Sequence, residues 1–311
     1  MRLVFLGTPE FSIPSLRELI HKGHEIAAVI TQPDRPKGRG QKVTSSPVAM
    51  MSQELGLRVL KPIDVNSAES IDTLSALSPD LIVVVAYGLI LGTTLLGLPR
   101  LGCINLHASY LPKYRGVAPA NRAIMNGETW TGTTTIFMDE GIDTGDIILQ
   151  RKTEISPEET AGELLQRLAK EGASLLAETV LLVGDGKAPR VKQDSSLASY
   201  ARKLKKSDGE IKWDKDAIQV FNLIRGVTPW PGAFTFLRES LLKILKAQMV
   251  DFPSTGRVPG EILQIGQEGI LVRAGTGALS LLTLQPEGKR PMRFDEFARG
   301  RKLQPGEVFK S

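Results

Sequence analysis

The residues from Gly102 to Gly116 read G-C-I-N-L-H-A-S-Y-L-P-K-Y-R-G. They begin as an apolar strand that carries two polar residues, Asn105 and His107. These residues are two positions apart, so in a strand both side chains lie on the same side. A turn marked by Pro112 follows the strand. The stretch predicts a buried strand that ends in an amide and an imidazole, which is a suitable place for chemistry.

The segment before this strand, Asp80–Tyr87, reads D-L-I-V-V-V-A-Y and is the most apolar in the chain. It predicts a central strand in a sheet that is covered on both faces. Near the N-terminus, Leu3–Leu6 and Glu25–Thr31 read as strands on either side of a helix, which indicates a parallel sheet. Ligands bind at the carboxyl edge of such sheets. We therefore expect an α/β, Rossmann-like domain with Asn105 and His107 at that edge.

The length of the chain, 311 residues, suggests two domains. We expect a catalytic domain over residues 1–188, a linker over 189–206 and a second domain over 207–311. Several short, regularly spaced strands in the second domain predict a small barrel resembling an oligonucleotide-binding fold. Residues 200–311 hold 19 Lys and Arg against 12 Asp and Glu, whereas residues 1–199 have a net charge of −2. The basic module suggests a nucleic-acid partner, although a basic surface kept for solubility remains the alternative.

A second basic feature is the segment from Gln32 to Lys42, Q-P-D-R-P-K-G-R-G-Q-K. It has no apolar side chain, and its glycines let the backbone approach a partner closely. We interpret it as a flexible loop that contacts a phosphate backbone, although a solvated loop without a partner would have a similar composition. Its candidate phosphate contacts are Arg35, Lys37, Arg39 and Lys42.

Other kinds of site find little support in the sequence. The first strand is followed by Gly7 alone, not by the glycines of a dinucleotide fingerprint, and Glu10 would repel a pyrophosphate. There is no P-loop and no G-x-S-x-G serine elbow. A zinc site needs several soft or imidazole ligands, and the one cysteine and one histidine of this strand do not supply them, so we expect no metal. We interpret Cys103 as a small buried hydrophobic residue, not as a nucleophile.

The same features indicate where the protein works. A single cysteine fits a reducing compartment. The apolar run at Leu3–Leu6 is too short for a signal peptide, and no stretch approaches the length of a membrane span. We expect a cytoplasmic protein that does not contact membranes and that acts as a monomer.

The remaining candidate chemistry combines Asn105, His107 and Asp143, the last within the Gly-rich turn at residues 139–146. An imidazole moves protons near neutral pH, an amide N–H stabilises an oxyanion, and a carboxylate orients the imidazole. This set suits acyl transfer without a covalent intermediate. Taken singly, a lone histidine at a strand end is more often structural, and Asp143 alone reads as a turn former.

The combination resembles a known family. N-L-H-A-S-Y-L-P-K-Y-R-G, residues 105–116, is similar to the signature of the 10-formyltetrahydrofolate-dependent formyltransferases, and G-I-D-T-G-D, residues 141–146, is similar to their second motif. The resemblance extends from the opening V-F-L-G-T-P-E-F through the predicted barrel. Within the family, the basic loop and the basic tail resemble the members that act on methionyl-tRNA.

The resemblance implies an enzyme that transfers a formyl group from N10 of 10-formyltetrahydrofolate to the α-amino group of initiator methionyl-tRNA, for translation initiation. It implies the catalytic trio Asn105, His107 and Asp143. It also implies that the basic loop around Arg39 engages the acceptor end of the tRNA. The folate contacts that it implies are Ser109, Tyr110, Leu111 and Pro112, with the pterin-pocket wall near Val85, Tyr87 and Leu89.

Three rival functions remain open from the sequence. A formyltransferase acting on a small amine, such as a glycinamide ribonucleotide or an amino sugar, would share the trio but would not need the basic features. A folate-dependent hydrolase would use water in place of the amine. A non-catalytic RNA-binding protein would not need the intact trio.

Overall fold

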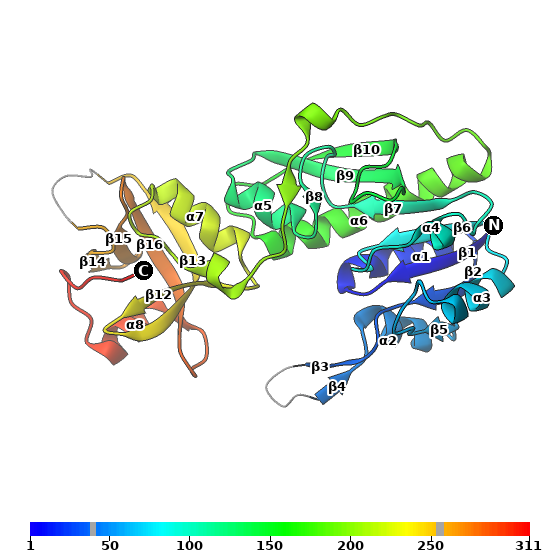
Figure 1. Ribbon diagram of the computed structural model, residues 1–311. Helices are drawn as coiled ribbons and strands as arrows, with labels where there is room; N and C mark the ends of the chain where they lie inside the picture. The colour runs from blue at the N-terminus through cyan, green and yellow to red at the C-terminus, as the bar shows by residue number, and fades with distance from the viewer. Residues whose placement is uncertain (38–41, 253–257) are drawn as a thin grey trace. The chain divides into compact units, whose positions relative to one another are not determined.

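The computed structural model describes residues 1–37, 42–252 and 258–311. The chain divides into two compact units (Figure 1). The first comprises residues 1–119, 131–154 and 165–201, and the second comprises residues 120–130, 155–164 and 202–311. The architecture confirms the predicted fold class, an α/β domain with a mostly parallel sheet followed by a small β domain. The exact domain and linker limits proposed above stay a prediction.

Within the described residues, the first unit is built on a seven-stranded sheet (Figure 1). Its strands are β1 (Arg2–Gly7), β2 (Glu25–Ile30), β5 (Val59–Leu60), β6 (Leu81–Val85), β7 (Cys103–His107), β9 (Trp130–Phe137) and β10 (Ile147–Glu154). Their spatial order is β10-β9-β7-β6-β1-β2-β5. The five neighbouring strands β7, β6, β1, β2 and β5 run parallel to one another, and β9 is antiparallel to β7. The strand β6 is central, as its unbroken apolar sequence predicts.

Helices cover both faces of this sheet. Successive residues of a strand point to opposite sides, and the strands are apolar on both sides, so each face packs against a layer of helices. On one face Phe5 and Val83 share a buried core with Leu176. On the other face Leu6 and Val84 share a buried core with residues of the opposite helix layer. The first layer is α1 (Ile13–His21), α2 (Pro47–Glu54) and α6 (Ala161–Gly184), and the second is α3 (Ala68–Ala76) and α4 (Thr93–Leu96).

The strand order reverses between β1 and β6, which places the topological switch point of the sheet there. Open α/β sheets bind ligands outside the carboxyl ends of the strands at this point. The loops at these ends are tied together: Thr8 Oγ1 donates to the carbonyl of Tyr87 at 3.0 Å, and Gln32 Nε2 donates to the same oxygen at 2.8 Å. The carboxyl edge is therefore a fixed frame on which a site can be built.

The ends of the basic segment form two short strands where the sequence predicted a loop, and residues 38–41 between them lie outside the described residues. The strands β3 (Arg35–Lys37) and β4 (Lys42–Thr44) pair antiparallel. At their root, Lys61 Nζ donates to Asp34 Oδ1 at 2.6 Å and to Ser45 Oγ at 3.0 Å. This ion pair lowers the pKa of the Asp34 carboxyl. Strands of three residues with polar sequences carry no periodic signal, which is why the pattern did not reveal them.

The second unit contains a six-stranded antiparallel sheet among its described residues. Its strands are β12 (Ala233–Leu237), β13 (Ser240–Val250), β14 (Ile262–Gly266), β15 (Gly269–Arg273), β16 (Ala278–Pro286) and β17 (Met292–Arg293). The end of the chain pairs with both open edges, through Phe236 with Lys310 and Glu261 with Val308. Because the same segment joins both edges, the sheet closes into the small barrel that the sequence predicted.

The core of the barrel is centred on Trp213, which is 2% exposed. Its ring stacks on Phe309 with 5.9 Å between the ring centroids, and its indole N–H donates to Thr235 Oγ1 at 2.9 Å. The remaining elements of the chain are β8 (Arg115–Gly116), β11 (Tyr200–Ala201), α5 (Pro119–Met125), α7 (Ala217–Gly226), α8 (Phe294–Arg301) and short 3-10 helices at Glu10–Ser12, Ser195–Leu197 and Lys206–Gly209. Among the described residues, no helix has the length and apolar character needed to span a bilayer.

Candidate active site

The strand β7 presents Cys103, Asn105 and His107 on one face and buries Ile104 and Leu106 in the core of the other. The short helix α4 covers only the start of the first face. There the Cys103 thiol lies 3.8 Å from the carbonyl of Leu95. Burial raises the pKa of this thiol to about 12, so it is not a thiolate at neutral pH. The predicted burial of Cys103 is confirmed.

Beyond α4, the same face of β7 meets the loop that carries Asp143. Asp143 Oδ2 lies 3.5 Å from His107 Nδ1, and Asn105 Nδ2 donates to Asp143 Oδ1 at 3.4 Å. All three side chains are largely shielded from water, with Asn105 and His107 at 9% and 6% exposure. The structure therefore brings together the three residues that the sequence predicted as the trio. In such surroundings charge interactions are stronger than in bulk water.

The loop at residues 139–146 holds Asp143 in a left-handed conformation, with φ of 54°. The backbone N–H of Gly116 donates to Asp143 Oδ2 at 2.8 Å, which fixes the carboxylate from the side of the turn after β7. The loop itself lies tightly against β9: a Cβ atom on Gly145 would lie 1.7 Å from the carbonyl oxygen of Phe137. The motif G-I-D-T-G-D therefore needs its second glycine for this close approach.

The hydrogen bonds of His107 determine which of its ring nitrogens can exchange a proton. Nε2 lies 3.0 Å from the carbonyl oxygen of Tyr114. A carbonyl oxygen only accepts, so Nε2 carries a hydrogen in either charge state of the ring. Nδ1, facing Asp143, is the nitrogen that gains or loses a proton. In the neutral ring, the hydrogen is therefore on Nε2, and Nδ1 is the basic nitrogen, directly beside the Asp143 carboxylate.

The turn after β7 is locked by its own hydrogen bonds. Ser109 Oγ donates to the carbonyl of Lys113 at 2.6 Å, and Thr134 Oγ1 donates to the carbonyl of Ser109 at 2.7 Å. The amide of Leu111 donates to Thr134 Oγ1 at 3.1 Å, and the peptide bond before Pro112 is cis. The Ser109 hydroxyl is thus occupied within the turn. The predicted folate contacts at Ser109, Tyr110, Leu111 and Pro112 stay a prediction.

The residues predicted near the pterin pocket differ in their surroundings. The side chain of Val85 lies in the core beneath α1 and α6, and Tyr87 lies in the core of the opposite face. Burial, followed by the negative charge of Asp64, raises the pKa of the Tyr87 hydroxyl to about 12. Leu89 is 40% exposed. A ligand at this edge would therefore meet Leu89 and the backbone of the other two residues, not their side chains.

Two further residues support the site, and the sequence did not single them out. The amide of Gln193 donates from Nε2 to the carbonyl oxygens of Asp143 and Gly145, each at 2.8 Å. Its Oε1 accepts from Nε and Nη2 of the buried Arg115, at 3.2 and 2.8 Å. Arg115 lies within the motif at residues 105–116, which the sequence did indicate. Gln193 lies in a polar, irregular stretch that offered no such signal.

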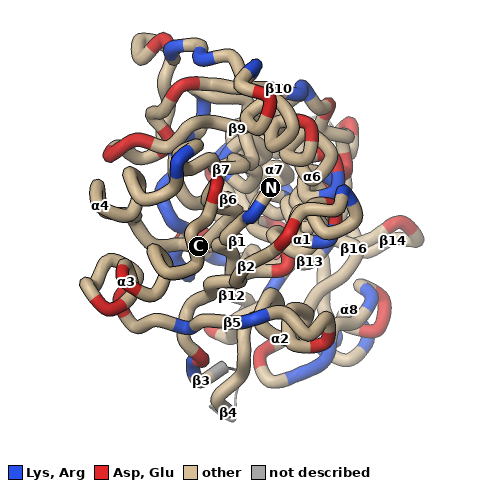
Figure 2. The backbone as a smooth tube through the Cα atoms, turned by 90° about the vertical axis from the view of Figure 1, so that its right-hand side faces the viewer, with Lys and Arg blue, Asp and Glu red and all other residues tan. Residues whose placement is uncertain are grey.

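The basic residues predicted to contact tRNA are only partly described. Arg35 is exposed at the start of β3. Lys37 and Lys42 are backbone partners in the ladder of β3 and β4, and Arg39 lies outside the described residues. The last segment of the second unit begins with a run of exposed cations within residues 202–206. These cations are Arg202, Lys203, Lys205 and Lys206. Figure 2 shows the Lys and Arg positions along the backbone in blue.

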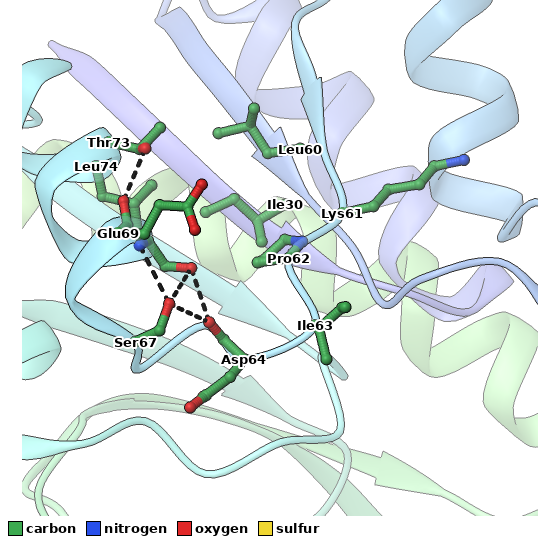
Figure 3. A pocket seen from close by; sticks show the side chains of 11 residues that line it. Ile30, Leu60, Lys61, Pro62, Ile63, Asp64, Ser67, Glu69, Thr73 and Leu74 are labelled. Carbon is green, nitrogen blue, oxygen red and sulfur yellow. Dashed lines mark hydrogen bonds between the residues drawn. The ribbon is translucent and has the colours of Figure 1, made fainter.

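A separate cavity of about 500 Å³ lies between β5 and α3 in the first unit (Figure 3). Ile30, Leu60 and Leu74 form its apolar wall, and Ser67 lies at its rim. The side chain of Lys61 extends away from it (Figure 3). None of the predicted site residues lines this cavity. Over the ranges that the structure describes, no group of three or more His, Cys, Asp or Glu is arranged to hold a metal ion.

Comparison with known proteins defines the class. Residues 1–180 match the formyl transferase family model, and residues 203–302 match the model of the formyl transferase C-terminal domain. The chain belongs to the formyl transferase family. Its relatives there include the methionyl-tRNA formyltransferase of Geobacter sulfurreducens, 50% identical over 98% of this chain and 96% of the relative. That of Moorella thermoacetica is 49% identical over 99% of both chains.

Solved structures share the fold at lower sequence identity. The N-formyltransferase of Helicobacter canadensis, in complex with folinic acid and dTDP-3-aminofucose, superposes with a TM-score of 0.68 at 20% identity. The match covers 91% of this chain and 98% of that one. HypX from Aquifex aeolicus, in complex with tetrahydrofolic acid, has a TM-score of 0.65 at 17% identity, over 96% of this chain and 47% of that one.

Proposed function

We propose that Asn105, His107 and Asp143 catalyse transfer of a formyl group from 10-formyltetrahydrofolate to the α-amino group of methionyl-tRNA. The substrates follow from the family and from relatives that match nearly the whole chain. The observation that carries the assignment of the trio is the position of the Asp143 carboxylate. Its two oxygens lie within 3.5 Å of Asn105 Nδ2 and His107 Nδ1 at the carboxyl edge of the sheet. The proposed acceptor is charged initiator tRNA.

The reaction joins the amine nitrogen to the formyl carbon and breaks the bond from that carbon to N10 of the folate. A free α-amino group has a pKa of about 8, so a useful fraction is uncharged and nucleophilic at neutral pH. Its attack places negative charge on the formyl oxygen. An amide N–H held in a shielded site stabilises such an oxyanion. Asn105 Nδ2 supplies this donor. Its NH2 group has two hydrogens, of which one is directed to Asp143 Oδ1 at 3.4 Å and the other is left for the substrate.

Two proton transfers complete the reaction. The attacking nitrogen loses one, and N10 gains one as it leaves. His107 Nδ1 is the exchangeable nitrogen of the ring, and the adjacent Asp143 stabilises the ring when it is positively charged. The pair therefore accepts the first proton and returns it to N10, directly or through water.

Asn105→Ala tests the oxyanion role. Loss of this donor is expected to lower kcat by about 100- to 1000-fold, or about 2.7–4 kcal/mol in the barrier, with little change in the affinity for tRNA. Steady-state kinetics with formylated folate and charged initiator tRNA measure the effect. Asn105→Asp retains the side-chain shape without the amide hydrogens and should be at least as impaired. A normal kcat in both variants would rule out the role.

Binding of methionyl-tRNA should weaken steeply with salt. Each phosphate contact contributes a slope of about −0.7 to −0.9 in a plot of log affinity against log salt concentration. Arg35→Ala is expected to make this slope less steep by at most about the contribution of one phosphate contact. Arg17→Ala, which removes an exposed cation from α1, is the matched control and should leave the slope unchanged. Equal slopes for wild type and Arg35→Ala would remove Arg35 from the predicted tRNA contacts.

The acceptor is tested by offering the enzyme and formylated folate three alternatives in parallel. These are charged initiator tRNA, a small amine such as an amino sugar nucleotide, and water alone. The proposed function predicts formyl-methionine in the first reaction, with slow formylation in the second and slow folate deformylation in the third. Faster formylation of the small amine would favour the rival substrate class, and rapid deformylation in water would favour a hydrolase.

A further inference from the structure

We propose that Gln193 is a positioning residue that holds the Asp143 backbone, and with it the carboxylate, in place for formyl transfer. This inference rests on the proposed role of Asp143. Gln193 comes from the polar stretch after α6, 50 residues beyond Asp143 in the chain. Its side chain links three parts of the site: the loop carrying Asp143, the turn after β7, and its own segment.

The orientation of the Gln193 amide is set by the group on its other side. Arg115 approaches Oε1 with two guanidinium N–H groups, at 3.2 and 2.8 Å. A guanidinium only donates, so it must face the amide oxygen. The NH2 group then points to the loop, where each of its hydrogens has one carbonyl partner, on Asp143 and on Gly145. Both ends of the side chain are therefore satisfied in a single arrangement.

This arrangement holds a strained residue from two directions. Asp143 has a positive φ of 54°, a conformation that L residues adopt at a cost and that persists when its surroundings determine it. Gln193 binds its carbonyl oxygen, while the Gly116 N–H binds its carboxylate. Arg115 immediately precedes Gly116 in β8, so the same short strand supports both contacts.

The segment that carries Gln193 is itself anchored on both sides. Val191 exchanges two backbone hydrogen bonds with Ile147, at 2.8 and 3.0 Å. Farther along, β11 pairs with β8, and the carbonyl of Ser199 accepts from the amide of Arg115 at 2.8 Å. Gln193 therefore projects from a fixed backbone. A part of the predicted linker forms a wall of the site.

Gln193→Glu separates positioning from packing. The substitution keeps the shape of the side chain and gives Arg115 a charged acceptor, so the segment stays anchored. It removes both amide hydrogens and sets a carboxylate against the carbonyl oxygens of Asp143 and Gly145. Because misplacement of a catalytic group by about 1 Å costs on the order of 100-fold in rate, we expect kcat to fall about 10- to 100-fold. The KM values for tRNA and folate should stay within about twofold of those of the wild type.

The test is a double-mutant cycle with Asp143→Asn, measured in single turnovers with excess enzyme. If Gln193 acts through Asp143, Gln193→Glu lowers the rate in the wild-type background but by less than about twofold in the Asp143→Asn background. Gln166→Glu, an exposed change of the same charge on α6, should have no effect in either background. Gln193→Ala repeats the cycle without adding a charge, and thermal unfolding shows that each variant is folded.

Two results would overturn the inference: a rate for both Gln193 variants within twofold of the wild type, or an equal loss in the two backgrounds, which indicates a general structural role. If Asp143→Asn alone leaves the rate unchanged, the proposed function of Asp143 fails, and the inference falls with it. The cycle therefore distinguishes the two failures.

Discussion

Asp143→Asn is expected to lower kcat about 1000-fold while leaving the affinity for tRNA nearly unchanged, within the range for loss of acid–base catalysis. The carboxylate accepts hydrogen bonds on both oxygens, from Asn105 Nδ2 and from the N–H of Gly116. An asparagine side chain has one acceptor oxygen and one donor NH2 group. Its NH2 group would therefore face one of these two donors, and that hydrogen bond would be lost. Asparagine also brings no negative charge to stabilise a protonated His107. Rapid mixing with formylated folate and charged tRNA measures the rate.

The substitution is well suited to the question, because asparagine tolerates the left-handed conformation at this position. The loop should therefore keep its fold, and thermal unfolding should show it. Asp185→Asn, at an exposed position after α6, removes a carboxylate elsewhere in the same unit and serves as the control. A turnover close to the wild-type value in Asp143→Asn would show that the carboxylate has no part in the chemistry.

His107→Ala is expected to have an effect of the same size or larger, about 1000-fold or more in kcat. The ring supplies the exchangeable nitrogen beside Asp143, and no other imidazole lies in the trio. The alanine variant also removes the hydrogen bond from the ring to the carbonyl of Tyr114. For that reason His107→Gln is the second variant: its amide N–H can still donate to Tyr114, but it does not exchange protons at neutral pH.

If positioning of the Tyr114 carbonyl were the main role of His107, the glutamine variant would recover most of the activity lost in the alanine variant. The proposed proton transfer predicts instead that both variants remain inactive while binding tRNA normally. Binding is measured with charged tRNA in the absence of folate. Recovery by glutamine would assign His107 a structural role.

Much of the fold could be predicted from the sequence because its signals are local. The apolar run at residues 80–87 marked the central strand, and alternation within β7 placed Asn105 and His107 on one face. The second unit does contain the several short strands that were predicted there. The pairing of β3 and β4 was missed, since a polar strand of three residues has no periodicity to detect.

The site could be predicted less completely, for a physical reason. Side chains that act in chemistry belong to short motifs with an unusual composition, and these drew attention to Asn105, His107 and Asp143. The groups that hold them do not: every residue has a backbone carbonyl like that of Tyr114, and a single glutamine such as Gln193 forms no motif. Gln193 reaches the site only through long-range pairing of its segment with β8 and β10. No pattern within that segment announces this contact.

The central claim is that the trio at the end of β7 transfers a formyl group to methionyl-tRNA. It is tested most directly by single-turnover formation of formyl-methionine, comparing wild type with Asp143→Asn at equal occupancy by both substrates. The account predicts rapid formation of formyl-methionyl-tRNA with one tetrahydrofolate released per formyl group by the wild type, and formation about 1000-fold slower by the variant. Equal rates for the two proteins, or release of tetrahydrofolate without formyl-methionine, would contradict it.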